Sequence, residues 1–137
     1  MTARTPLLLS AIALTACAAS GAPRQESVDK ELSRYQPYVG APITEFSTMK
    51  GINGWNSAGR EHLVVFLGVD EAYLLTVAAP CMNLDFTNHV GFKTRTPSML
   101  TRFDNVEVGD RERCPITEIR PIDYQRMKAE LRQKEAK

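Results

Sequence analysis

The chain has 137 residues, of which 43% are hydrophobic and 24% are charged, the composition of an ordinary globular domain. Seventeen basic residues against sixteen acidic residues leave a formal net charge of +1, so no overall field favours binding to nucleic acid or to acidic polymers. The length is sufficient for one domain, and the net charge does not indicate any class of charged partner.

The N-terminus has the pattern of an export signal. Arg4 supplies a positive start, and the apolar run at 7–16 is shorter than the ~20 residues of a transmembrane helix. The run ends in Leu14-Thr15-Ala16-Cys17, which looks like a bacterial lipobox whose cysteine receives the lipid. We therefore expect a lipoprotein signal peptide at 1–16 and lipidation of Cys17. The alternative is an ordinary secretory signal cut at neighbouring alanines.

Lipidation of Cys17 would hold the protein on a membrane without a spanning segment, because two lipid signals already suffice for stable attachment. Ala18 stands where an aspartate would resemble an inner-membrane retention signal, so the outer membrane is favoured, with the protein facing the periplasm. Residues 17–29 are small and polar, a composition typical of a flexible tether.

A short helix is expected at 30–38, where Leu32 and Tyr35 continue an apolar stripe that ends at Pro37. A strand is expected at 44–51. Two turn sequences, Asn53-Gly54 and the stretch at 56–59, then place Trp55 at a strand start or a loop edge. Both a buried Trp55 and a ligand-stacking Trp55 are compatible with this position.

The most apolar part of the domain lies at 61–81. Runs at 62–67 and 72–79 flank Gly68-Val69-Asp70-Glu71, the signature of a β-hairpin. Because both runs are almost continuously apolar, both faces of these strands should be covered. The register stays open, since a two-residue turn would place Val64 on the face of Tyr73 and a three-residue turn would exchange the faces.

A short strand at 90–96 precedes a second hairpin, formed by 103–108 and 112–122. A three-residue loop, Gly109-Asp110-Arg111, is preferred because it places the valines of the first strand on the same face as Cys114 and Ile116. Pro115 should make part of the last strand an edge or a bulge.

A charged helix at 123–137, capped by Asp123, should follow, and its end has no apolar residue to dock and should fray. Together the elements predict a mainly β domain at 39–122, with α+β as the broader alternative. We expect a small antiparallel barrel or curved sheet of five or six strands with a helix at each end.

Cys81 and Cys114 are the cysteines that remain once Cys17 is lipidated, and exported proteins mature in an oxidising compartment. A disulfide between them is expected, worth about 3 to 4 kcal/mol in the chain-entropy model. The alternative uses Cys81, Cys114, Met82 and His89 as soft ligands for copper or zinc. Metal-binding spacings such as C-x-x-C are missing, so no metal or other cofactor is expected.

The sequence points away from an enzyme without deciding the question. The G-x-S-x-G motif does not occur, and a disulfide would remove both thiols. Four carboxylates could meet across loops but are interpreted as solvated strand and turn residues: Asp85, Asp104, Glu107 and Asp110. The later strands also carry a mixed face of bases and acids, with bases at Lys93, Arg95, Arg102, Arg111 and Arg113.

The residues left for a ligand or partner lie in the loops around the sheet. This predicted rim consists of Trp55, Asp85, His89, Arg111 and Arg113.

Several stretches also carry a family resemblance: Trp55, Ala72-Tyr73-Leu74-Leu75, Cys81, Asp104-Asn105-Val106, and Cys114-Pro115-Ile116 with Ile119. Through these residues, the region 39–122 resembles a family of small proteobacterial lipoproteins that is classed as a domain of unknown function. The resemblance implies a shared disulfide-tied fold and no catalytic residue.

The expected function is a lipid-anchored bacterial envelope protein that acts as a non-enzymatic binding or accessory module at the membrane surface. Its expected partners are the membrane, through the N-terminal lipid, and an envelope protein or glycan, with no nucleic acid. The alternatives are a small periplasmic hydrolase with a loop-assembled site and a soft-metal carrier.

Overall fold

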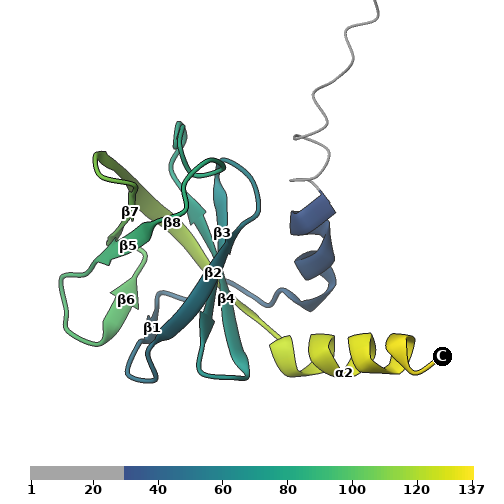
Figure 1. Cartoon of the computed structure of the whole chain (residues 1–137). Helices are drawn as coiled ribbons and strands as arrows, with labels where there is room; N and C mark the ends of the chain where they lie inside the picture. The colour runs from purple at the N-terminus through teal and green to yellow at the C-terminus, as the bar shows by residue number, and fades with distance from the viewer. Residues whose placement is uncertain (1–29) are drawn as a thin grey trace, which may run out of the picture.

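The computed structural model describes residues 30–137, which form an antiparallel β domain with two helical segments packed beside it (Figure 1). The predicted class, a mainly β curved sheet with a helix at each end, is confirmed. A helix at 30–35 leads into the other elements, which in chain order are η1 Gln36–Tyr38, β1 Glu45–Ser47, β2 Ile52–Ser57, β3 His62–Leu67, β4 Glu71–Val77, β5 Val90–Lys93, β6 Met99–Thr101, β7 Asn105–Val108, β8 Glu112–Ile122 and α2 Tyr124–Glu135.

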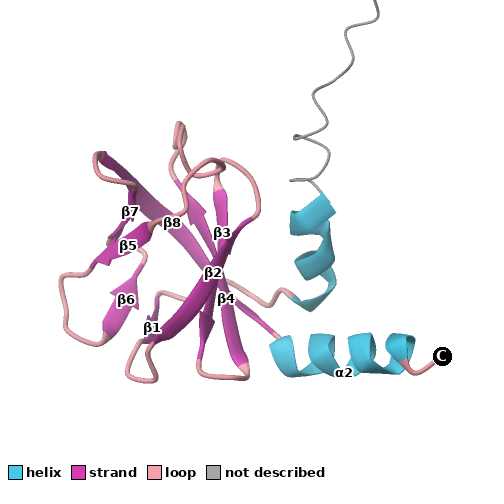
Figure 2. Ribbon diagram, in the orientation of Figure 1, coloured by secondary structure: helices cyan, strands magenta, loops and turns pink. Residues whose placement is uncertain are grey.

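Six of the strands form one sheet in the order β2-β3-β4-β8-β7-β5, which curls into a half-barrel (Figure 2). The strands β1 and β6 form a separate antiparallel pair, so the described residues contain more strands than the five or six expected. Phe46 of β1 and Leu100 of β6 pack into the same core as the inner face of the large sheet. The small pair therefore covers the concave side of the half-barrel.

The central hairpin has a three-residue loop at 68–70, because Leu67 pairs with Glu71. This register places Val65 opposite Tyr73 on the inner face and Val64 opposite Leu74 on the outer face. Both faces are covered, as the continuous apolar runs predicted.

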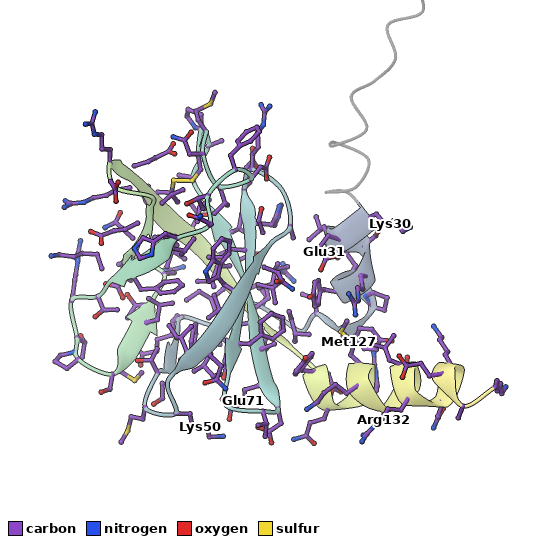
Figure 3. The ribbon with its side chains drawn as sticks, in the orientation of Figure 1. Lys30, Glu31, Lys50, Glu71, Met127 and Arg132 are labelled. Atoms are coloured by element: carbon purple, nitrogen blue, oxygen red, sulfur yellow. A yellow bond between two sulfur atoms is a disulfide. The ribbon has the colours of Figure 1, made fainter. Side chains whose placement is uncertain are left out.

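The outer face of β3, β4 and β8 is covered by the helices. Tyr35 and Met127 are both 2% exposed and belong to one buried cluster with Leu74 and Ile122. In Figure 3, Met127 lies between the two helical segments. The predicted cap of α2 is confirmed, because the Asp123 carboxylate accepts a hydrogen bond from the backbone N–H of Arg126 at 3.1 Å.

The second hairpin has the predicted three-residue loop at 109–111, since Val108 pairs with Glu112 and Val106 with Cys114. Of the two outcomes expected from Pro115, an edge or a bulge, the edge does not occur, because β8 lies between β4 and β7. A bulge does occur, two residues beyond Pro115. Val77 pairs with Ile116 and Thr76 with Glu118, which leaves Thr117 as the extra residue.

Local turn propensity misled two predictions at 44–59. The strand expected at 44–51 ends at Ser47, because the chain turns back at Gly51, whose φ of 78° suits glycine. Asn53 and Gly54 lie inside β2 and not in a turn, and Trp55 pairs with Val65 in mid-strand. Pairing with β3 outweighs the turn preference of Asn-Gly, and a register shift between Ile52 and Gly54 accommodates it.

Two strand bounds in the later part of the chain also differ from the prediction. The strand β5 ends at Lys93, short of the predicted 96, and β7 begins at Asn105, after a turn that contains Phe103 and Asp104. The short strand β6 was not predicted.

In the part of the chain that the structure describes, no helix has the length and apolar character that a membrane span requires. The predicted signal peptide at 1–16, the lipidation site Cys17 and the tether at 17–29 lie outside the described residues.

Candidate functional site

The predicted site residues gather in part around one end of the sheet, where the loop after β4 meets the β7–β8 hairpin. Cys81 and Cys114 are joined by a disulfide at this point, with 5.8 Å between their Cα atoms, and both are 1% exposed. The disulfide ties the loop after β4 to β8, the strand that also pairs with β4. It holds this end of the domain as one unit.

Glu112 is the residue at this end that the sequence analysis missed. Its carboxylate accepts hydrogen bonds from the backbone N–H groups of Met82 at 2.7 Å and Asn83 at 2.9 Å. The alternation of side chains along the last strand could have indicated this role, because Glu112 is two residues from Cys114 and projects from the same face of the strand. Glu112 fixes the start of the loop after the disulfide.

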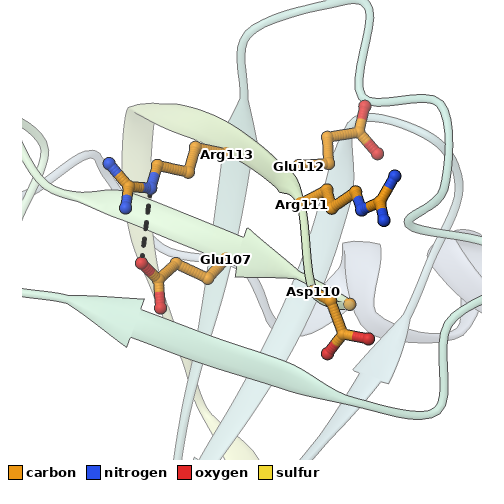
Figure 4. Close-up of a pocket in the computed structure, with 6 residues that line it drawn as sticks. Glu107, Asp110, Arg111, Glu112 and Arg113 are labelled. Carbon is orange, nitrogen blue, oxygen red and sulfur yellow. Dashed lines mark ion pairs between the residues drawn. The ribbon is translucent and has the colours of Figure 1, made fainter.

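Arg111 and Arg113 line a cavity of about 380 Å³ on the β7–β8 hairpin (Figure 4). Arg113 forms an ion pair with Glu107, with 3.4 Å between Nε and the carboxylate oxygen. Asp110 and Glu112 also line the cavity, so three acids offset two bases. The arginines form part of a mixed surface, and the cavity carries no positive excess.

Asp85 and His89 have separate roles in the loop that follows the disulfide. The Asp85 carboxylate accepts a hydrogen bond from Ser57 Oγ at 3.2 Å and lies 3.8 Å from Arg60 Nε, with its side chain 8% exposed. The backbone carbonyl of His89 accepts a hydrogen bond from the N–H of Gly109 at 3.0 Å. Asp85 therefore links the loop to the β2–β3 turn, and His89 links it to the β7–β8 hairpin.

Trp55 does not lie in the rim where the sequence analysis placed it. It projects from the middle of β2 on the face shared with Val65 and packs, partly buried, against the inner core. The structure places Trp55 in the packing of the concave face, apart from the loops that carry Asp85 and Arg111.

The interpretation of Asp104 as a solvated carboxylate is wrong. It is 1% exposed and accepts hydrogen bonds from the backbone N–H of Arg95 at 2.9 Å, the backbone N–H of Thr101 at 2.8 Å and Thr101 Oγ1 at 3.0 Å. A buried carboxylate with three donors stabilises a loop, and here the loop is the one that carries β6.

Among residues 30–137, Cys81, Cys114 and Glu112 form a group whose ligand atoms lie close enough to hold a metal ion. The ligand atoms of Cys81, Cys114 and Glu112 lie within 4.8 Å of one another, a set that differs from the alternative with Met82 and His89. In this structure the two sulfur atoms are bonded to each other, so they are not thiolates able to bind a metal.

A Ser-x-x-Lys spacing, which serves nucleophilic catalysis in some hydrolases, occurs at Ser47 and Lys50. Ser47 Oγ accepts a hydrogen bond from the backbone N–H of Met49 in an exposed turn, and Lys50 pairs with Glu71 (Figure 3). The hydrogen bond to Glu71 raises the pKa of Lys50. The two side chains thus bond to other groups, Ser47 to Met49 and Lys50 to Glu71, and the spacing by itself assigns no catalytic role.

One protein family matches the sequence over its whole length, residues 1–137: the family of unknown function DUF6491. The chain belongs to DUF6491. No curated protein and no solved structure is similar enough to count as a match. The description of DUF6491 assigns no reaction or ligand to its members.

Proposed function

We propose that this DUF6491 protein is a lipid-anchored protein of the bacterial envelope, a finer identity than the family description gives. The observation that carries the proposal is Leu14-Thr15-Ala16-Cys17 at the end of a short apolar run. Lipid on Cys17 would anchor the domain through a tether at 17–29, which spans ~20 Å as a flexible coil. The domain would then act close to the membrane surface, with the outer membrane favoured by Ala18.

The disulfide supports an envelope location. Disulfides persist in secreted and periplasmic proteins and are rare in the reducing cytosol. The Cys81–Cys114 bond is buried and ties two parts of the chain that are 33 residues apart, as expected of a structural bond in an exported domain.

Within the envelope, we propose that the domain is a non-enzymatic binding or accessory module. Its predicted rim residues serve the fold or form a charge-balanced surface: Trp55 packs on the core, and Arg113 is paired with Glu107. Two exposed apolar residues, Met82 at 55% and Phe86 at 59%, lie among charged and polar residues on the loop after the disulfide. Such mixed surfaces suit contact with another envelope component.

Lipidation is tested by expressing the full chain in a Gram-negative bacterium fed with a clickable palmitate analogue. The wild-type protein should take up the label and fractionate with membranes, and Cys17→Ala should lose both. The double variant Cys81→Ala/Cys114→Ala is the matched control, because it removes cysteines without touching Cys17 and should stay labelled. Labelling of Cys17→Ala, or an unlabelled wild type, would refute the anchor.

The binding role is tested by crosslinking the lipidated protein in its native envelope. We expect reproducible crosslinks from a photoreactive residue at position 86, and fewer from the same residue at position 134, on the exposed end of α2. Failure to recover any reproducible partner from position 86 would contradict the module.

A further inference from the structure

A second cavity lies on the outer face of the sheet, away from the rim, between η1 and the strands β3, β4 and β8. Its volume is about 320 Å³, near the lower end of the roughly 300–1,000 Å³ typical of ligand sites. Its lining is mostly polar and comes from four elements: Gln36, His62, Thr76, Glu118 and Arg120.

The sheet register assembles this cavity from residues far apart in sequence. His62 pairs with Thr76 and Thr76 with Glu118, so the three side chains form a row across β3, β4 and β8. Neighbouring strands are ~4.8 Å apart, which spreads the row across the width of a small ligand. The bulge at Thr117 places Glu118 on this face, because it shifts the alternation of β8 by one residue.

The charged groups of the cavity are held in place. Arg120 Nε donates to Glu118 Oε1 at 2.6 Å, and Arg120 Nη1 donates to the backbone carbonyl of Gly40 at 3.3 Å. Both side chains remain partly exposed, at 36% for Arg120 and 39% for Glu118. A carboxylate and a guanidinium are thus presented side by side, and their charges cancel.

Part of the cavity lining is apolar. Leu74, 4% exposed, lies beside the polar row on the same face, opposite Arg120, and Val39 contributes a second apolar wall. Leu74 belongs to the buried cluster with Tyr35 and Met127, so residues of both helical segments pack with it.

We propose that this cavity binds a neutral, polyhydroxylated ligand, namely one ring of a sugar or glycan. Glu118 accepts hydrogen bonds from hydroxyl groups, Arg120 donates to them, and Thr76 does both. An anionic ligand would face Glu118 and a cationic one would face Arg120, whereas a neutral ligand meets neither penalty. The C–H face of a sugar ring fits Leu74 and Val39.

This inference goes beyond the proposed function, because it assigns a ligand class to a site outside the rim, and it holds whether or not Cys17 is lipidated. A single ring of about a dozen heavy atoms should bind weakly, with a dissociation constant of about 1 mM. Longer glycans would bind with higher affinity only if they made contacts outside the cavity.

The test is NMR titration of the isotope-labelled full chain, in detergent micelles, with glucose, N-acetylglucosamine and inorganic phosphate. At least one of the sugars should shift the amide signals of residues 62, 76, 118 and 120, and phosphate should not. Shifts confined to the β7–β8 hairpin, stronger binding of phosphate, or no sugar binding at about ten times the expected dissociation constant would each overturn the proposal.

Two variants sharpen the assignment. Glu118→Gln keeps the size of the side chain and removes the acceptor charge, and it should weaken sugar binding about tenfold. The matched control is Glu107→Gln, which alters an Arg–Glu ion pair away from this cavity, the one between Glu107 and Arg113, and should leave binding unchanged. Equal weakening by both changes would refute the site. If Glu118→Gln lowers the melting temperature, Thr76→Val provides a second test and should weaken binding in a folded domain.

Discussion

The carboxylate of Asp104 accepts the backbone N–H of Arg95, nine residues earlier, at 2.9 Å, and so closes the loop that carries β6. The same carboxylate also receives two hydrogen bonds from Thr101, and the backbone carbonyl of Asp104 accepts the N–H of Ile116 on β8. One buried residue thus joins the β1–β6 pair to the large sheet.

Asp104→Ala should destabilise the domain by about 3 kcal/mol, because it leaves two part-buried backbone N–H groups without their acceptor. Urea unfolding of the full chain measures this loss. Asp110→Ala is the control, since Asp110 is exposed in the neighbouring hairpin and its loss should cost less than about 0.5 kcal/mol. Equal effects of the two changes would contradict the structural role of Asp104.

Removal of the disulfide by Cys81→Ala/Cys114→Ala should cost about 3 to 4 kcal/mol, because the bond restricts the unfolded chain over a separation of 33 residues. Thermal unfolding with and without a reductant gives the measurement. The wild-type melting temperature should fall in the reductant, whereas that of the double variant should not change. If the melting temperature of the wild type did not fall after reduction of the disulfide had been confirmed, the bond would contribute little to stability.

Glu112→Gln should release the start of the loop after the disulfide, because an amide offers one oxygen to two backbone donors. The amide hydrogens of Met82 and Asn83 should exchange faster, and the domain should lose about 1 kcal/mol. Glu107→Gln provides the comparison, since its partner Arg113 is 68% exposed. Unchanged exchange at residues 82 and 83 would argue against the capping role.

Stability should fall at alkaline pH, because three phenols have a raised pKa in the folded state. Burial raises the pKa of Tyr35 and Tyr73 above 10.0, and a hydrogen bond to Glu130 raises that of Tyr38. The folded state therefore holds these protons more tightly, so their contribution is complete below pH 10.0 and is lost as the pH rises through the raised values.

Urea midpoints between about pH 8 and pH 11 test this prediction. Tyr73→Phe keeps the ring stacked on Phe46, at 3.9 Å between centroids, and removes one phenol. Its stability should therefore decline less above pH 10 than that of the wild type. A flat wild-type profile over this range would contradict the assignment.

The loop at 109–111 could be predicted because side chains alternate along the two strands. Only a three-residue loop places the valines of the first strand on the same face as Cys114 and Ile116. The disulfide could be predicted from the cysteine count and the export signal. Trp55 could not be placed correctly, because Asn53-Gly54 favours a turn that pairing with β3 overrides. Asp104 could not be placed either, because its burial depends on hydrogen bonds to Arg95 and to Ile116 of β8, which are distant in sequence.

The sequence by itself determined the mainly β class, the Asp123 cap of α2, the three-residue loop at 109–111 and the motif at Cys17. Each of these depends on residues that are close together in the sequence. The tertiary structure alone decided which distant side chains meet. His62, Glu118 and Arg120 share one cavity because strand register and the bulge at Thr117 set the face on which each residue projects. A shift of one residue reverses that face and leaves the local sequence unchanged, so no local pattern reveals it.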